Sequence, residues 1–446
     1  MNPLTTAEFL ISIGKKEDAK KVLDIMKPYC VTVPQLDAIG KLYSDIRQFE
    51  TCLEIAIKIH DLTNNPEQQY DSRVNIIRSC LNLNKPYKAL RYIELNEKAK
   101  PNDHANRMDK ALALFFLNRK SESEDILRRI LTEPRTDDID GRVRFNLGTY
   151  ELATGNFKQG LRQVLLGGRK FNTWHTYKLP LNMMFEGPPQ PGRTILMCAE
   201  GGLGDEFISI RFQKQYKDAG MNPIFYTDRK DLAAIFQRNG FETITSLEQY
   251  QPNWLWCYSM PSPCFLDLDE DQLWYGPYIK PIRKAKQLEG KIKIGIKGSG
   301  NPEYDQDLHR SIPIDKVLDI LPKNAIIYSF HIDEDIEDSR VVSLKNDIKS
   351  WDDTLDYLDQ MDLVISSCTS LAHAASAMGK KTVVMVPILN YYPWGRPTRH
   401  SKWYSENTTI LRQIQYDNWN LPLNELKGYI DVFNSENKCQ SDFYSQ

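Results

Sequence analysis

A pattern with a period of 33 to 37 residues runs through the first 170 residues of the chain. Each unit has a Gly, Asn or Arg where a helix is expected to end, and a small residue follows five positions later. Apolar residues fall at helical spacing on both sides of the turn. A period of this length predicts antiparallel helix pairs that stack into a curved solenoid. The marker pairs are Gly14 and Ala19, Arg47 and Cys52, Asn84 and Ala89, Asn118 and Ser123, and Gly155 and Gly160.

The segment Gly187-Pro-Pro-Gln-Pro-Gly192 breaks helices, because it is rich in proline and glycine, and the sequence pattern changes after it. Short apolar strands then alternate with amphipathic helices in two sets, and the break lies near residues 276–290. This alternation predicts two parallel sheets with helices on both faces. Strands are expected at residues 194–198, 224–227, 254–259, 292–297, 325–331, 363–366 and 382–387, and helices from residue 205 and at 230–238, 315–321, 353–360, 370–378 and 422–433.

The predicted fold class is therefore α plus α/β, with a helical solenoid followed by two Rossmann-like domains. Two doubly wound domains place the carboxyl ends of their strands around one crevice, where ligands bind. We expect helical repeats over residues 1–173, a linker over 174–192, a first Rossmann-like half over 193–285, a second half over 286–420, and a C-terminal helix and tail over 421–446.

The composition is that of an ordinary globular protein. The 446 residues are 41% hydrophobic and 26% charged with a formal net charge of −2, so no overall charge attracts nucleic acid or an anionic membrane. The N-terminus lacks the features of a signal peptide, and no run of about 18 apolar residues occurs. The eight cysteines have neither a Cys-x-x-Cys nor a zinc spacing. We expect a cytoplasmic protein, located in the host cytoplasm if a phage encodes it.

Glycines and small hydroxyl residues lie at the ends of several predicted strands. Ala199-Glu-Gly-Gly-Leu-Gly-Asp205 follows the first strand of the first half. Ile294-Gly-Ile-Lys-Gly-Ser-Gly-Asn-Pro302, Arg310-Ser-Ile-Pro313 and Ser366-Ser-Cys-Thr-Ser-Leu-Ala-His373 lie in the second half. Such turns let a backbone approach a ligand closely, and anions bind the amide groups of loops and helix N-termini. The arrangement suits a nucleotide diphosphate and predicts an enzyme that uses a nucleotide sugar.

Five markers occur in order within residues 195–413. They are Glu200-Gly-Gly-Leu-Gly-Asp205, Gly300-Asn-Pro302, Asp307-Leu-His-Arg-Ser-Ile-Pro313, residues 362–373, and Trp394 with Ser401-Lys-Trp-Tyr404. With them the chain resembles the tetratricopeptide-containing glycosyltransferases of the two-Rossmann (GT-B) type. These are related to the heptosyltransferases and more distantly to the O-linked N-acetylglucosamine transferases. The last helical unit, with Gly148, Gly155-Asn-Phe157 and Gly160, also resembles the tetratricopeptide signature.

The resemblance implies an inverting hexosyl-, pentosyl- or heptosyltransferase that moves a sugar from a nucleotide diphosphate to an acceptor hydroxyl. The first half would hold the acceptor, the second would hold the nucleotide sugar, and the C-terminal helix would cross back onto the first half. Asp205, on the turn of Gly202 and Gly204, would be the base, a role that suits a carboxyl whose pKa burial has raised. The alternative is that Asp205 caps the following helix.

Basic and hydroxyl residues of the second half form the predicted donor site. Lys297 ends the strand that opens this half, and Arg310 with Ser311 lies in a loop that returns to the same edge. Cations there would offset charge on the departing diphosphate, although Lys297 is also explained as an exposed strand end. Thr369 and Ser370 begin a helix, so their amides and hydroxyls are placed for the diphosphate.

His373 lies four residues after Thr369 and therefore on the same helical face. The family resemblance implies that His373 donates to a phosphate or to the ribose, whereas a single histidine on a helix is more often structural. Trp394 and Trp403 are predicted either to stack on a sugar or base or to pack between the domains.

Cys368 departs from the family, in which many relatives have an aspartate that binds hydroxyls of the donor sugar. We place Cys368 in the donor site, where a thiol is a poor hydrogen-bonding substitute and predicts a different sugar or a different way of holding it. The acidic stretch Asp267-Leu-Asp269-Glu-Asp271 has the form of an Asp-x-Asp metal motif, but a solvated loop explains it. No metal or other cofactor is expected, since the resemblance implies that basic side chains and helix dipoles replace the metal.

The expected partners are a nucleotide-sugar donor and an acceptor protein, glycan or DNA presented near the solenoid. Some phage-encoded transferases modify hydroxymethylated DNA bases, but the near-neutral net charge argues against DNA. A catalytically inactive nucleotide-binding scaffold is the alternative from another class. Cys368 favours that alternative, and the retained Asp205, Lys297 and Arg310 oppose it.

Overall fold

The chain forms two compact units, Met1–Pro134 and Arg135–Gln446. The expected domain boundary between residues 173 and 174 lies outside the described residues. The computed structural model describes residues 3–170, 177–302, 304, 307–332, 335–389, 391–396, 398–416 and 418–443.

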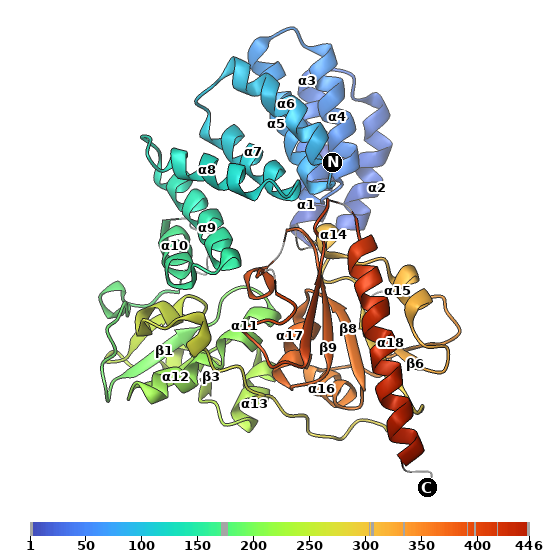
Figure 1. Ribbon diagram of the computed structural model, residues 1–446. Helices are drawn as coiled ribbons and strands as arrows, with labels where there is room; N and C mark the ends of the chain where they lie inside the picture. Colours follow the sequence, from blue (N-terminus) through green and yellow to red (C-terminus); the bar gives the residue numbers. More distant parts are fainter. Residues whose placement is uncertain are drawn as a thin grey trace. The chain divides into compact units, whose positions relative to one another are not determined.

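The first unit consists of four antiparallel helix pairs (Figure 1). Each helix packs against the next one in the chain, which buries the apolar faces that a single pair would leave exposed. The helices are α1 (Pro3–Ser12), α2 (Lys16–Met26), α3 (Val33–Asp45), α4 (Phe49–Leu62), α5 (Pro66–Asn82), α6 (Pro86–Ala99), α7 (His104–Phe116) and α8 (Lys120–Ile130).

The turns within the pairs confirm the sequence pattern. The marker residues Gly14, Arg47, Asn84, Asn118 and Gly155 all have a positive φ, between 56° and 97°. In each turn the amide of the following residue donates to a carbonyl five residues earlier at 2.8 to 2.9 Å, which satisfies the end of the first helix. The paired small residues are buried, so the second helix packs closely on the first.

A fifth helix pair, α9 (Asp137–Thr154) and α10 (Phe157–Lys170), belongs to the second unit. Glycines allow its close packing, since a Cβ atom on Gly148 would lie 2.7 Å from the carbonyl oxygen of Gly160. At the tip of the pair, a Cβ on Gly155 would lie 2.8 Å from the guanidinium carbon of Arg396. The last repeat therefore packs on the sheet-containing part of the same unit.

The first sheet is parallel and has the order β3-β2-β1-β4. Its apolar core residues alternate between two faces, as the period of a strand requires. One face, with Met197 and Phe225, packs against the helices. The strands are β1 (Thr194–Cys198), β2 (Asn222–Tyr226), β3 (Thr243–Ile244) and β4 (Leu255–Tyr258), and the helices are α11 (Leu203–Ser209), α12 (Phe212–Asp218) and α13 (Lys230–Arg238).

The other face of this sheet corrects the expectation of helices on both sides. Leu196, Cys198 and Trp256 on this face pack under segment 177–184, which contains the short 3-10 helix η2 (Leu181–Met183). The Trp256 indole donates to the carbonyl of Pro180 at 2.8 Å, which fixes the segment on the sheet. Part of the expected linker is thus a structural cover for the first half.

The second sheet is also parallel, with the order β10-β9-β8-β5-β6-β7. Its central strands are buried on both faces, as their apolar runs predict. The strands are β5 (Lys293–Lys297), β6 (Ile326–Ser329), β7 (Val341–Ser343), β8 (Leu363–Ser367), β9 (Thr382–Val386) and β10 (Thr408–Arg412), and the helices are α14 (Asp307–Arg310), α15 (Ile314–Ile320), α16 (Trp351–Asp359), α17 (Ser370–Ala377) and α18 (Asn420–Phe443).

Helix α18 does not follow the expected path back onto the first half. Leu423, Leu426, Ile430 and Phe433 lie on one side of the helix and pack into the core of the second half, together with α15 and the second sheet (Figure 1). The apolar side of α18 is thus buried against its own half of the molecule. The prediction that this helix crosses back onto the first half is therefore wrong.

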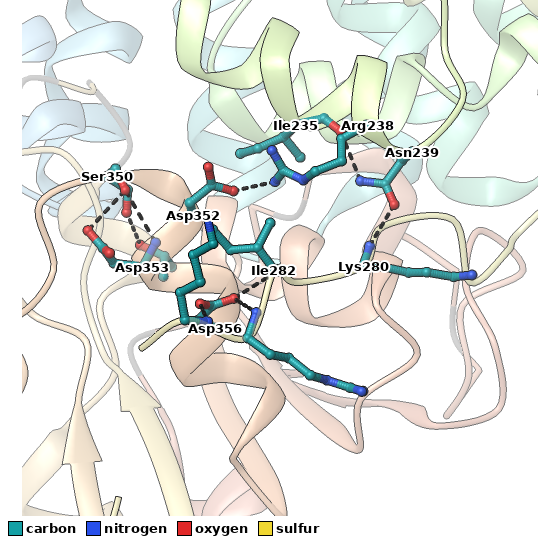
Figure 2. A network of polar contacts seen from close by, with 12 residues as sticks. Ile235, Arg238, Asn239, Lys280, Ile282, Ser350, Asp352, Asp353 and Asp356 are labelled. Carbon is teal, nitrogen blue, oxygen red and sulfur yellow. Dashed lines mark hydrogen bonds and ion pairs between the residues drawn. The ribbon is translucent and has the colours of Figure 1, made fainter. Parts of the chain in front are cut away.

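The connection between the two sheets is fixed by one carboxylate. Asp356 of α16 accepts four backbone N–H groups from residues 282–285, at 2.5 to 2.9 Å (Figure 2). Nearby, Arg238 at the end of α13 forms an ion pair with Asp352 at the start of α16. These contacts join the two halves.

Candidate active site

Asp205 lies in the first turn of α11, directly after the glycine turn that follows β1. Its Oδ2 accepts the amide N–H of Gly202 at 2.6 Å. Gly201 has a φ of +71°, and a Cβ atom there would collide with this carboxylate. Asp205 is therefore the N3 residue that accepts the amide of the N-cap residue Gly202, and its other oxygen accepts a hydrogen bond from the phenol of Tyr391 in the second half.

Two carboxyl groups at this turn have raised pKa values. Burial raises the pKa of Asp205, while the hydrogen bonds from Tyr391 and Gly202 and the charge of Arg229 lower it. Glu200 is buried, with Oε2 accepting the amide of Met260 at 2.9 Å, and burial raises its pKa well above the usual range. The buried environment of this turn thus favours the protonated form of both carboxyl groups more than an aqueous environment would.

The Asp205 turn meets the start of α17. Gly204 lies so close to this helix that a Cβ atom on it would be 2.7 Å from Cδ2 of His373 and 3.5 Å from the Cα of Ser370. The sequence predicted an open crevice between the strand ends of the two halves, whereas the structure packs these two turns directly against one another.

His373 is buried in an aromatic group rather than open to solvent. Its Nδ1 lies 2.8 Å from the Tyr404 hydroxyl, and its ring stacks on Trp394 with the centroids 4.7 Å apart. Burial and the charges of Arg211 and Arg310 lower the pKa of His373 to about 3. The imidazole is therefore neutral at physiological pH.

Arg310 joins two loops of the second half. Its Nε donates to Asp307 at 2.7 Å, and its Nη1 donates to the carbonyl of Cys368 at 3.1 Å, just before α17. The guanidinium also lies 4.7 Å from the ring centroid of Tyr304. A cation is therefore held beside the start of α17.

The hydroxyl residues predicted for the donor site have different surroundings. Thr369 is the N-cap residue of α17, and within the described residues its hydroxyl lies 3.1 Å from Ser366 Oγ rather than on an amide of that helix. Ser311 donates its hydroxyl to the carbonyl of Asp307 at 2.8 Å, and Lys297 donates to the carbonyl of Phe330 at 3.3 Å. The contacts of Thr369, Ser311 and Lys297 thus all lie within the second half.

The remaining predicted side chains are buried. Burial raises the pKa of the Cys368 thiol to about 11, which keeps it protonated. The Trp394 ring stacks on the rings of both His373 and Tyr404, and the Trp403 indole donates to Glu270 at 2.8 Å. Both tryptophan side chains are thus buried against other side chains of the protein.

Charges of the acidic stretch are paired across the second unit. Lys158 of α10 contacts Asp267 at 3.1 Å and Asp269 at 3.7 Å, and Lys402 forms an ion pair with Asp271. No cluster of three or more His, Cys, Asp or Glu side chains that could hold a metal ion occurs among the described residues.

Two important residues of this region were not identified from the sequence. Arg211 is fully buried, with its guanidinium near the rings of Tyr278 and Tyr404 and a hydrogen bond to the carbonyl of Trp403. Tyr391, on the connection between β9 and β10, donates its phenol to Asp205. A charged residue between apolar helices was the available signal for Arg211, whereas no local pattern pointed to the pairing of Tyr391 with Asp205.

No protein-family model and no curated relative matches the chain. Among solved structures, a mutant of the Thermobaculum terrenum O-GlcNAc transferase is 9% identical, with 80% of this chain and 83% of that chain covered and a TM-score of 0.33. A TPR protein from Thermus thermophilus is 15% identical, with 39% and 91% covered and a TM-score of 0.30. The MamA RS-1 double mutant is 13% identical, with 39% and 97% covered and a TM-score of 0.30. These likenesses are weak.

Among the described helices, none combines the length and the apolar character needed to cross a membrane. The seven cysteines with described side chains are buried.

Proposed function

We propose that the chain is an inverting glycosyltransferase of the GT-B type, which moves a sugar from a nucleotide diphosphate to an acceptor hydroxyl. The contact between the Asp205 turn and the start of α17 carries this proposal, since Gly204 touches both Ser370 and His373. A carboxylate of one half and a helix N-terminus of the other half are thus neighbours. A glycosyl transfer needs both a base and an anion site at the same place.

The donor diphosphate would bind at the start of α17. Helix N-termini attract phosphate because their first amides lack partners within the helix. Thr369 and Ser370 begin α17, and Arg310 donates to the Cys368 carbonyl beside them. Arg310 would offset the charge that develops on the departing nucleotide diphosphate, so no metal ion or other cofactor is invoked.

Other second-half residues would complete the donor site. Lys297 and Ser311 lie on segments that lead to the same sheet edge, and His373 would offer a neutral N–H. Cys368 would stand near the sugar, where its protonated thiol makes only weak hydrogen bonds. Trp394 would support this site from behind, through its stacking on His373.

Asp205 would be the catalytic base. The acceptor oxygen bonds to the anomeric carbon as its proton passes to the Asp205 carboxylate, and the bond to the nucleotide diphosphate breaks with the electron pair leaving on phosphate oxygen. One displacement inverts the anomeric carbon. The burial that raises the pKa of Asp205 makes it a better proton acceptor than an exposed aspartate.

The acceptor is proposed to be a hydroxyl on a protein or a glycan, with DNA as the alternative. Helical repeats offer extended surfaces for such partners. The net charge of −2 favours a protein or glycan over DNA, because binding DNA requires many contacts between basic residues and phosphates.

A donor screen with an Asp205→Asn variant tests the function. UDP-, ADP-, GDP- and CMP-sugars are screened first for a thermal shift, since specific binding stabilises the folded state. The best donor is then assayed for hydrolysis and transfer. We expect Asp205→Asn to bind the donor and to lose transfer by roughly 10²- to 10⁴-fold, the usual contribution of a general base.

Asp267→Asn is the matched control, because this exposed aspartate pairs with Lys158 in the acidic stretch. It should keep full transfer activity. A folded Asp205→Asn protein with undiminished transfer would rule out Asp205 as the base. A donor that stabilises the wild type without any turnover would instead support the nucleotide-binding scaffold that Cys368 favours.

A further inference from the structure

Both oxygens of the Asp205 carboxylate are already engaged. Oδ2 accepts the amide N–H of Gly202 at 2.6 Å, and Oδ1 accepts the phenol of Tyr391. The first contact is local and belongs to the turn. The second comes from the other half, because Tyr391 lies on the connection between β9 and β10.

A base must offer a lone pair to the hydroxyl that it deprotonates. The Tyr391 phenol is itself a hydroxyl that points its proton at Asp205 Oδ1. We propose that Tyr391 holds the place of the acceptor hydroxyl at Asp205, so that acceptor binding displaces the phenol and takes over its hydrogen bond. This inference rests on the proposed function and makes Tyr391 a positioning residue.

The surroundings of Tyr391 fit a side chain that can be displaced. Its ring is half-buried and lies on an irregular connection that precedes the short 3-10 helix η6 (Tyr392–Trp394). Its ring centroid is 4.6 Å from that of Tyr392 and 5.9 Å from that of His373, both in edge-on arrangements. A movement of the phenol would expose the rings of Tyr392 and His373 that it now contacts, and a sugar ring packs well on aromatic rings.

The phenol also sets the charge of the waiting base. Burial raises the pKa of Asp205, whereas the hydrogen bond from Tyr391 and the charge of Arg229 lower it. Glu200 lies on the same turn, and its burial favours its own neutral form. The Tyr391 hydrogen bond therefore offsets part of the effect of burial and favours the carboxylate form of Asp205, the form that accepts a proton from the acceptor.

The test compares Tyr391→Phe with the wild type in acceptor kinetics over a range of pH. Removing the phenol removes the competitor, so the acceptor KM should fall about tenfold while kcat changes less than about twofold, a difference that corresponds to one charge-assisted hydrogen bond. The acid limb of kcat/KM should move to higher pH, because Asp205 loses a group that lowers its pKa.

Tyr328→Phe is the matched control. This tyrosine is buried in the second half and donates to the carbonyl of Glu289 at 2.8 Å, so it loses a comparable hydrogen bond away from Asp205. Its KM and pH profile should equal those of the wild type. If Tyr391→Phe folds poorly, Tyr391→Leu serves as the second variant, with the same expected fall in acceptor KM.

The outcomes separate this inference from the proposed function. A wild type without transfer activity toward any donor and acceptor would overturn both. An active wild type whose Tyr391→Phe variant loses kcat, with unchanged acceptor KM and an unmoved acid limb, would overturn the displacement and leave the transferase in place. A lower KM together with the moved limb would support it.

Discussion

The two helices that meet at the candidate active site differ in what satisfies their first turn. In α11 the carboxylate of Asp205 accepts the amide of Gly202 from within the same turn. In α17 the Thr369 hydroxyl lies against Ser366 Oγ, and Arg310 stands beside the helix start. The same strand-turn-helix unit thus carries its own anion in one half, and in the other half its helix start is the place where we propose that an external anion binds.

The pKa values of the buried groups beside the two helices also differ. In the first half, burial raises the pKa values of Glu200 and Asp205, so carboxyl groups hold protons more readily there. In the second half, burial and the charges of Arg211 and Arg310 lower the pKa of His373, so the imidazole stays neutral. Burial thus favours the protonated form of Asp205, whereas burial and the cations Arg211 of the first half and Arg310 of the second favour the neutral form of His373.

Replacing Arg310 by Gln should have the largest effect, a loss of affinity for the nucleotide at the start of α17. The variant loses the cation beside α17 and its charged hydrogen bond to the Cys368 carbonyl. Charge-assisted hydrogen bonds contribute about 1.5–3 kcal/mol, so the affinity for a nucleoside diphosphate should fall roughly tenfold to a hundredfold. Isothermal titration with UDP, ADP and GDP measures the change.

Arg283→Gln is the control for this titration, because Arg283 is exposed and pairs with Asp359. It should bind the nucleotide as the wild type does. Equal affinities of the Arg310 and Arg283 variants would mean that the anion site is elsewhere.

Replacing Gly204 by Ala should separate the two helices. The new Cβ would lie 2.7 Å from His373 Cδ2, and His373 cannot move freely because it stacks on Trp394. Overpacking of this kind costs about 1–3 kcal/mol. Urea denaturation should show a lower midpoint, and transfer activity should fall because the base moves away from the donor site.

Gly202→Ala is the matched control on the same turn. There the nearest atom to a Cβ is Asp205 Oδ2 at 3.5 Å, an ordinary contact, and the φ of −93° suits alanine. A Gly204→Ala protein as stable and active as Gly202→Ala would show that the close contact between α11 and α17 is not required.

Local features of the fold could be predicted because they depend on neighbours in sequence. The turns at Asn84 and Asn118 follow from residues that tolerate a positive φ, and β1 and α13 follow from their apolar patterns. The short edge strands β3 and β7 were missed, since two or three residues carry too little pattern.

Contacts between distant segments could not be predicted in the same way. Asp205 and Tyr391 are 186 residues apart, and only the packing of two sheets brings them together. The path of α18 was mistaken because an apolar helical face does not reveal which of two similar sheets it will cover. Local motifs identified Asp205, Arg310 and His373 as candidate site residues. Only the tertiary structure showed which residues they contact.

Replacing Glu200 by Gln should have the smallest effect and should appear as a change in pH dependence. Because burial raises the pKa of Glu200 in the folded state above the usual value of 4.5, the folded protein retains a proton that the unfolded chain has lost. Glu200 therefore makes the free energy of unfolding fall as pH rises from about 4.5 toward the folded-state pKa, by about 1.4 kcal/mol per pH unit. Glutamine can still accept the Met260 amide and does not titrate.

Urea midpoints from about pH 5 to pH 8 should thus fall less steeply in Glu200→Gln than in the wild type. Asp205 contributes a slope of the same sign, since its pKa is also raised, so the slope should be reduced rather than abolished. Glu248→Gln, a change at an exposed carboxyl, should leave the slope unaltered. Identical slopes in the wild type and the Glu200 variant would mean that Glu200 is ionised when folded, and that the first half does not favour protonated carboxyls as the comparison of the two helices requires.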